Sequence, residues 1–322
     1  MMNEINQANW SLDANPADAT SADATKLLPD IAAAKAAQRG VLQWVGMRNV
    51  RAPLLIAASS GAAAERVAAS VDVYVNLTDA DARGIHMSRL YLLLESLAEV
   101  PVSSQSLRDL LGRLIESQAG LADAARIVLR FDLMLRRRAL KSQLSGWKAY
   151  PVRMDARLGA DGLRVQQELR IAYSSTCPMS AALSRQIQRE HFEHHFGQSS
   201  QVPVSAVAEW LEQESGLAAT PHAQRSQAVL NLSWQPDVAN WPVLALIDQV
   251  EQALATPVQT AVKRIDEQTF ARLNAENLMF CEDAARRVAT VLRGVPSLAD
   301  FEVDVAHFES LHAHDAVAVA VR

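Results

Sequence analysis

The sequence has few cysteines, no long apolar run and no large excess of charge. Two cysteines, Cys177 and Cys281, cannot build a disulfide framework, so we expect a reducing, cytoplasmic compartment. No apolar run reaches the length of a membrane span, and the first residues lack the basic start and apolar core of a secretory signal. The formal net charge of -5 gives no general attraction to nucleic acid or to an anionic membrane. An anionic small ligand would therefore need a local basic pocket.

The composition otherwise fits a soluble globular protein of one large or two medium domains. Hydrophobic residues make up 49% and charged residues 21% of the 322 positions, which leaves ample material for a buried core. Residues 1–26 are rich in Ala, Asp, Asn, Ser and Thr and follow no sustained period. We therefore expect a disordered tail over these residues.

Periodicity predicts a mixture of strands and helices. Residues 71–77 alternate strictly between apolar and polar, which predicts a strand. Residues 103–138 are predicted to be helical, because aliphatic residues in their first part mark one helical face. Strands are also expected at 152–158, 163–173 and 258–263. Since the order of strands, helices and strands occurs again after residue 200, we expect an α+β fold with two similar halves.

A thiol stands just beyond the strand predicted over 163–173. Cys177 is followed by Pro178, which breaks regular structure, and small polar residues surround it. A thiol held at the end of a strand can be a metal ligand or a nucleophile. A lone Cys can equally be a small buried hydrophobe, so the residue alone leaves both interpretations open.

Two other segments carry candidate functional groups. His222 follows a proline in an extended loop and directly precedes an alternating strand. Arg83, His86 and Arg89 cluster where a strand gives way to a helix. Helix starts bind anions and arginine supplies forked donors, so this cluster could contact phosphate. A solvated turn with surface ion pairs remains the alternative.

His191 and His195 lie one helical turn apart, which is a spacing found in metal sites. No third ligand follows at a recognisable distance, and Gln, Arg and Glu surround the pair. We therefore expect a solvated helix face here rather than a metal site.

Seven short motifs, taken together and in order, resemble the type IB GTP cyclohydrolases over roughly residues 28–322. They are RGIHMSR (83–89), STCPMS (175–180), PHAQRS (221–226), TPVQT (256–260), KRIDE (263–267), FCED (280–283) and ESLHAH (309–314). The resemblance implies the tunnelling fold, with two similar modules of antiparallel sheet and helices packed on one face. The modules would span 27–150 and 151–322, with a helical insertion near 185–218. It also implies a homotetramer.

The resemblance further implies an activity: conversion of GTP and water to 7,8-dihydroneopterin triphosphate and formate, the first step of folate biosynthesis. The implied cofactor is a divalent metal ion, which is zinc, manganese or iron. Carried over motif by motif, the metal ligands are Cys177, His222 and Glu267. Catalytic roles fall to Cys177, Glu282 and His312, with His314 as a second proton carrier. The substrate residues are Glu309 for the guanine edge and Arg83, His86, Arg89, Arg225 and Lys263 for the triphosphate.

The chemistry of these residue types fits the implied reaction. Opening the imidazole ring of guanine requires water to attack C8, and a divalent ion lowers the pKa of bound water towards neutrality. Cys, His and Glu give three protein ligands and leave a position open. Many relatives have a second Cys where this chain has Met179, so a dithiol mechanism is excluded. About thirty extra residues also separate Cys177 from His222.

Two other functions remain open at this point. A nitrile oxidoreductase of queuosine synthesis, also a tunnelling-fold enzyme, would use Cys177 as a covalent nucleophile with NADPH. A purine- or pterin-binding protein without activity is the second alternative. The His222 and Glu267 segments favour a metal over the first, and Glu282 and His312 favour catalysis over the second.

Overall fold

The computed structural model describes residues 32, 34–57, 63–236 and 238–322. The tail predicted over 1–26 lies outside this part of the chain. The described residues form one eight-stranded sheet, in which every strand pairs antiparallel with the next one in the sequence. The expected α+β class is confirmed.

The strands are β1 (Leu42–Ile56), β2 (Glu65–Leu77), β3 (Ala125–Arg138), β4 (Ser145–Gly159), β5 (Gly162–Thr176), β6 (Ala223–Trp234), β7 (Leu298–His307) and β8 (Ala316–Val321). The α-helices are α2 (Met87–Leu93), α3 (Ser104–Ser117), α4 (Pro178–Phe196), α5 (Val204–Glu212), α6 (Val243–Leu254), α7 (Arg264–Glu276) and α8 (Cys281–Arg293). Two short 3-10 helices are η2 (Leu94–Ala98) and η3 (Glu214–Gly216).

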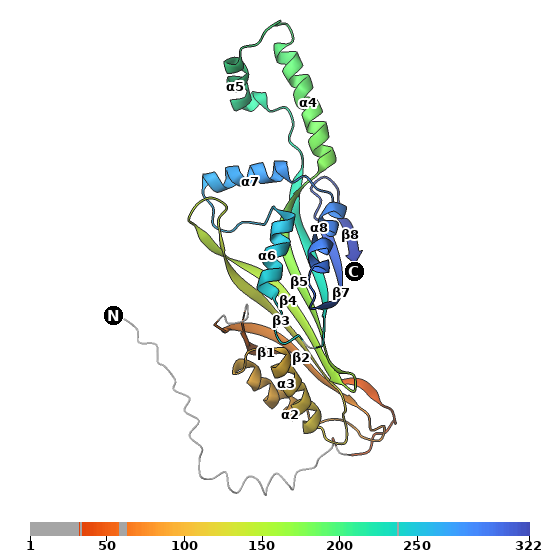
Figure 1. Ribbon diagram of the computed structural model, residues 1–322. Helices are drawn as coiled ribbons and strands as arrows, with labels where there is room; N and C mark the ends of the chain where they lie inside the picture. Colours follow the sequence, from red (N-terminus) through yellow and green to blue (C-terminus); the bar gives the residue numbers. More distant parts are fainter. Residues whose placement is uncertain (1–31, 33, 58–62, 237) are drawn as a thin grey trace, which may run out of the picture.

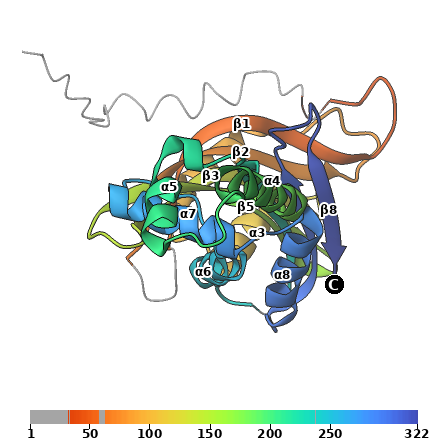
Figure 2. The same cartoon turned by 90° about the horizontal axis from the view of Figure 1, so that it is seen from above.

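The helices are distributed unevenly around the sheet. Helices α3, α6 and α8 cover one face of it, α7 lies across one end, and α4 projects beyond that end with α5 beside it (Figures 1 and 2). None of the helices in the described ranges is both long and apolar enough to cross a membrane.

The core lies between the sheet and its helices. In β3, Ile127, Leu129 and Phe131 are buried against the helical layer, whereas Arg130 and Asp132 between and beyond them lie on the other face. The same alternation runs through β4 and β5. Each buried aliphatic or aromatic side chain contributes about 1.5–3 kcal/mol relative to exposure. One continuous core cluster therefore joins both ends of the sheet.

The helix predicted over 103–138 is wrong in its second part. Helix α3 starts with a capping box, in which Ser103 and Ser106 bond to each other's backbone amides, and it ends at Ser117. After a short loop, the chain continues as β3. Apolar residues in β3 recur at every second position, so the period had already changed from that of a helix to that of a strand.

The strand predicted over 258–263 is also wrong. This segment is a loop, with one isolated bridge between Pro257 and Tyr173 beside it. β5 pairs with β4 only as far as Leu169, and the chain meets the free edge of β5 beyond that point, where the amide of Ser174 donates to the carbonyl of Thr256 at 2.9 Å. This pairing ends at Pro257, and the following residues lead directly into α7.

The order strand–strand–helices–strand–strand occurs twice along the chain, as β1 to β4 and as β5 to β8. Helices α4 and α5 are inserted between β5 and β6, near the expected 185–218. Strand β4 runs through position 150 without a break, and the sheet is continuous. The division into modules 27–150 and 151–322 stays a prediction.

Candidate functional site

Cys177 and His222 lie side by side because their strands are paired. Thr176 and Ala223 are the last pair of the β5–β6 ladder, so Cys177 and His222 are opposite each other one position beyond it. The backbone amide of Cys177 donates to the carbonyl of His222 at 3.3 Å, and the amide of His222 donates to Ser180 Oγ at 3.1 Å. Strand pairing thus joins two groups that are far apart in the sequence.

Cys177 is the N-cap of α4. Its Sγ accepts a hydrogen bond from the backbone amide of Ser180 at 3.5 Å, and Pro178 occupies the first helical turn. The positive end of the helix dipole favours a negative charge at this position. The thiolate is the form of cysteine that binds metal or acts as a nucleophile.

The ring of His222 is oriented by a chain of buried polar groups. Its Nδ1 lies 2.9 Å from Gln224 Oε1, and Gln224 Nε2 donates to Ser175 Oγ at 2.9 Å. Since an amide oxygen can only accept, Nδ1 carries the proton and Nε2 is left as the basic nitrogen. Metal-binding histidines are commonly oriented in this way, by a hydrogen bond from the ring nitrogen that does not bind the metal. Sequence reasoning did not single out Gln224, although it shares a face of β6 with the buried Ser226.

Glu309 joins the same group from just beyond the end of β7. Phe308 donates its amide to the carbonyl of Arg225 at 3.1 Å, so the pairing of β6 and β7 continues past Ser226 and His307. The carboxylate Oε2 of Glu309 lies 3.7 Å from His222 Nδ1. This oxygen is buried and has no hydrogen-bond partner among the described residues. A buried carboxylate oxygen without a donor is costly unless a ligand supplies one.

The start of α8 completes the group. The amide of Met279 donates to the carbonyl of Thr176 at 3.2 Å, which fixes α8 beside the Cys177 loop. Cys281 Sγ donates to Glu282 Oε2 at 3.3 Å. Burial and the neighbouring Glu282 raise the pKa of Cys281 to about 11, so this thiol is neutral at physiological pH. A hydrogen bond from its own backbone amide and the Cys281 thiol lower the pKa of Glu282, which is therefore ionised.

These segments enclose a cavity of about 450 Å³, here named the thiol cavity. Its lining includes Cys177, His222, Gln224, Cys281, Glu282, His307, Glu309, His312 and His314. The rings of His312 and His314 are stacked, with centroids 5.0 Å apart. Exposed apolar side chains form its rim: Met179, Leu183, Phe280 and Leu311.

Glu267 does not line the thiol cavity. It lies on the exposed side of α7, whereas its neighbour Asp266 is buried. The Asp266 carboxylate accepts hydrogen bonds from the amides of Lys141 at 2.7 Å and Lys263 at 2.8 Å. Asp266 therefore ties the β3–β4 hairpin to the start of α7. Lys263 and Arg225 are exposed and also lie outside the cavity lining.

The predicted phosphate cluster lies elsewhere. Arg83, His86 and Arg89 precede or begin α2, which is near the opposite end of the molecule from the base of α4 (Figure 1). Arg89 donates to the carbonyl of Ser117 at 2.8 Å, and Arg83 is exposed. None of the three lines the thiol cavity of its own chain.

His191 is half-buried and His195 is exposed, so the helix face is partly solvated, as predicted, but both rings also pack against α5. Their rings lie 5.3 and 5.6 Å from the ring of Trp210, which is buried. His191 Nε2 also lies 2.6 Å from the carbonyl oxygen of Ser215. The pair holds the two inserted helices together. Across the described part of the chain, no three His, Cys, Asp or Glu side chains are close enough together to hold a metal ion.

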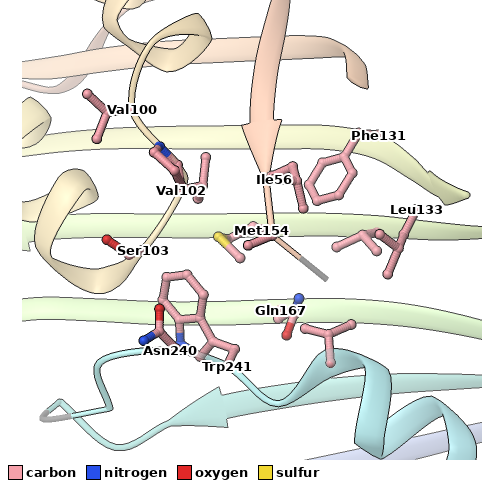
Figure 3. Close-up of a pocket in the computed structure, with 14 residues that line it drawn as sticks. Ile56, Val100, Val102, Ser103, Phe131, Leu133, Met154, Gln167, Asn240 and Trp241 are labelled. Atoms are coloured by element: carbon pink, nitrogen blue, oxygen red, sulfur yellow. The ribbon is translucent and has the colours of Figure 1, made fainter. Parts of the chain in front are cut away.

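A second cavity of about 370 Å³, here named the seam cavity, lies between the starts of α3 and α6 (Figure 3). It is lined mainly by apolar residues, among them Phe131, Val152, Met154 and Trp241. The buried amide of Gln167 is among its few polar groups, and its lining contains no titratable side chain. Its size alone would make it a candidate, but it lacks groups for acid–base or metal chemistry.

Comparison with known proteins identifies the family. The family model for "Type I GTP cyclohydrolase folE2" matches residues 28–318. A "GTP cyclohydrolase FolE2" from Pseudomonas putida (strain GB-1) is 45% identical over 293 residues, which cover 91% of this chain and 95% of the relative. Uricases from Arthrobacter globiformis (TM-score 0.46, 8% identity, 88% of this chain and 93% of theirs) and Bacillus fastidious (TM-score 0.42, 10% identity, 87% and 92%) are similar solved structures. The chain belongs to the FolE2 family of type I GTP cyclohydrolases, which has the tunnelling fold.

Proposed function

We propose that the thiol cavity is where this GTP cyclohydrolase converts GTP and water to 7,8-dihydroneopterin triphosphate and formate, as the first step of folate biosynthesis. The observation that carries this proposal is the unpartnered, buried Oε2 of Glu309 beside His222. The edge of guanine carries paired N–H donors, which a carboxylate can accept with both oxygens. Guanine would therefore satisfy an acceptor that the protein itself leaves without a donor.

The metal-binding assignment is part of the same proposal. Cys177 is held at the start of α4, and His222 has its Nδ1 bonded to Gln224, which leaves Nε2 for a metal. The sulfur and nitrogen donors fit zinc or iron, and Glu267 as the third ligand would add the oxygen that manganese prefers. A divalent ion bound there would supply hydroxide at neutral pH.

We further propose that the site is completed in a homotetramer. Glu267, Arg83, His86, Arg89, Arg225 and Lys263 do not line the cavity of their own chain. A neighbouring copy could supply the missing carboxylate and the basic groups for the triphosphate. Exposed apolar side chains on the cavity rim, and on the edge strand β8, support such an assembly because large exposed apolar patches mark interfaces.

The remaining residues would handle protons. Water adds to C8 of guanine, the ring C–N bond breaks, and formate leaves after a second bond to that carbon is cut. Glu282 is ionised and so suits a base or an orienting group more than an acid. His312 and His314 line the same cavity and are exposed, and imidazole rings are the usual proton carriers in enzyme sites.

The test is an assay of the full-length protein with GTP and Mn²⁺ or Zn²⁺ in a reducing buffer that matches the cytoplasm. We expect pterin fluorescence and stoichiometric formate. NADPH consumption with a nitrile substrate and no pterin would overturn the proposal in favour of the oxidoreductase. Tight guanosine binding without turnover under any of the ions would indicate a binding protein instead.

A further inference from the structure

A chain of buried polar side chains runs between His222 and His307, two of the histidines that line the thiol cavity. The side chains between them belong to Gln224 (8% exposed), Ser175 (0%), Ser226 (0%) and Tyr173 (0%), and His307 itself is 3% exposed. A buried polar hydrogen without an acceptor is costly, so each hydrogen in such a chain needs a definite partner.

The register of three strands aligns this chain. In the β5–β6 pairing Gln224 is opposite Ser175 and Ser226 is opposite Tyr173, and in the β6–β7 pairing Ser226 is opposite His307. Ser175 Oγ lies 2.9 Å from Gln224 Nε2 and 2.8 Å from Ser226 Oγ, and Tyr173 Oη lies 2.8 Å from His307 Nε2. Burial raises the pKa of Tyr173, and a hydrogen bond from the Ser226 hydroxyl opposes this rise. That bond joins the two parts of the chain.

Counting donors gives each hydrogen of the chain one position. The amide nitrogen of Gln224 can only donate, so Ser175 accepts from it. The hydroxyl hydrogen of Ser175 then goes to Ser226, its one other side-chain partner among the described residues. Ser226 in turn donates to Tyr173, and Tyr173 donates to Nε2 of His307. A ring nitrogen that accepts carries no hydrogen, so neutral His307 carries its hydrogen on Nδ1.

The Nδ1 nitrogen of His307 is available to a ligand. His307 lines the thiol cavity, and its Nδ1 has no hydrogen-bond partner within the described ranges. Burial lowers the pKa of His307, although the charges of Glu309 and Glu282 act in the opposite direction. The ring is therefore neutral at physiological pH and offers a single N–H to the cavity.

We propose that His307 contacts the substrate in the thiol cavity, with its Nδ1–H as a fixed hydrogen-bond donor to an acceptor of the guanine base. This role rests on the GTP cyclohydrolase activity proposed for that cavity. Glu309, two residues further along, would accept from the N–H donors of the guanine edge. Guanine carries acceptors, O6 and N3, on either side of those donors. A donor and a carboxylate that line the same cavity therefore complement guanine.

The four side chains between the histidines are then positioning residues. They hold the hydrogen of His307 on Nδ1, where it serves the base. At the other end of the same chain, the bond to Gln224 holds the hydrogen of His222 on Nδ1 and leaves its Nε2 for a metal. One direction of hydrogen bonding thus sets both imidazoles at once.

Neutron diffraction from deuterated crystals of the full-length protein tests the direction of the chain. We expect a deuteron on Nδ1 of both His222 and His307 and none on Nε2 of His307. A deuteron on Nε2 of His307 would overturn the proposal, because the chain would then run the other way. This measurement does not depend on turnover, so it separates the inference from the proposed function.

Steady-state kinetics with GTP test the contact. We expect His307→Ala to lower kcat/KM about thirtyfold, and His307→Asn, whose side-chain N–H can take the place of Nδ1–H, to stay within about threefold of wild type. Tyr173→Phe removes the donor to Nε2 and should lower kcat/KM about fivefold. The matched control is Tyr74→Phe, which removes a buried hydroxyl bonded to Arg48 outside the cavity and should change kcat/KM less than about twofold.

Two kinetic results would contradict the role of His307. Wild-type kcat/KM in His307→Ala would show that the ring makes no contact with substrate. Equal losses in His307→Ala and His307→Asn, with unchanged thermal melts, would show that the N–H is not what matters. Absence of GTP turnover in the wild type would instead contradict the proposed function, and the neutron result would still decide the direction of the chain.

Discussion

The thiol cavity and the seam cavity are similar in size and opposite in chemistry. The thiol cavity measures about 450 Å³ and collects two thiols, two carboxylates and four imidazoles. The seam cavity measures about 370 Å³ and has no titratable lining residue. The first lies where β5 and β7 end and β6 begins, whereas the second lies beside residues in the middle of β3, β4 and β5.

This difference follows from which side chains can face inward at each position along a strand. In the middle of a strand, the side chains that face the helical layer must be apolar to join the core, as Val152 and Met154 do. Beyond the end of a strand, the backbone turns and polar side chains can point inward without losing all contact with water. Chemistry therefore gathers at strand ends, and cavity volume alone does not identify a site.

Of all substitutions in the two cavities, removal of the Cys177 thiol should lower activity the most. We expect Cys177→Ala to lower kcat by roughly a thousandfold or more, on the order of 4 kcal/mol, because the proposed metal loses its sulfur ligand. Pterin fluorescence with GTP and metal analysis of the purified variant measure both effects.

Cys281→Ala is the matched control within the same cavity. The Cys281 thiol is neutral at physiological pH, since its pKa is raised to about 11 by burial and by Glu282. A neutral thiol is a poor metal ligand. We expect this variant to keep its bound metal. Loss of metal from Cys281→Ala together with retention by Cys177→Ala would reverse the assignment.

A smaller effect is expected from the buried carboxylate. Glu309→Gln removes the charge but keeps the shape, and it turns one acceptor into a donor facing the donors of guanine. We expect kcat/KM for GTP to fall about a hundredfold, or ~2.7 kcal/mol, with bound metal unchanged. Glu302→Gln, on the exposed side of β7, is the control and should behave as wild type. A normal kcat/KM in Glu309→Gln would remove this residue from the guanine site.

Substitutions in the lining of the seam cavity should change the stability of the protein and leave its activity unchanged. Met154 is only 3% exposed, so Met154→Ala should lower the free energy of unfolding by about 2 kcal/mol while kcat stays within twofold. Met134→Ala, at an exposed position of β3, should change neither. Denaturant melts and the GTP assay provide the two measurements. A large fall in kcat for Met154→Ala would mean that both cavities serve the reaction.

The sequence predicted most of the fold because the alternation of apolar and polar residues in a strand is visible in a short segment by itself. The strictly alternating residues 71–77 and the strand predicted over 163–173 are both found where expected, in β2 and β5. The failure over 103–138 came from extending one helical face past its end at Ser117. Two local signals separate α3 from β3: the change of period, and Gly120, which adopts a φ of 81° just after the helix ends.

The candidate site was harder to predict from the sequence than the fold. Short motifs located Cys177 and His222, but their contact depends on which residues of β5 and β6 pair. Register is set by the whole sheet and by burial on one face, which the sequence does not display locally. Gln224 was missed for the same reason, since its support of His222 exists only once the strands are aligned.

The smallest effect on activity should come from the inserted helices. His191 and His195 stack on Trp210 and line neither cavity, so replacing both with Ala should leave kcat and KM for GTP within twofold of wild type. The loss should instead appear locally, because α5 is held to α4 by these rings together with Phe192 and Phe196. Hydrogen exchange should become faster in α5 and remain unchanged in β5 and β6. If the double variant lost metal or turnover, the inserted helices would take part in the chemistry. The thiol cavity would then not be the only part of this region that serves the reaction.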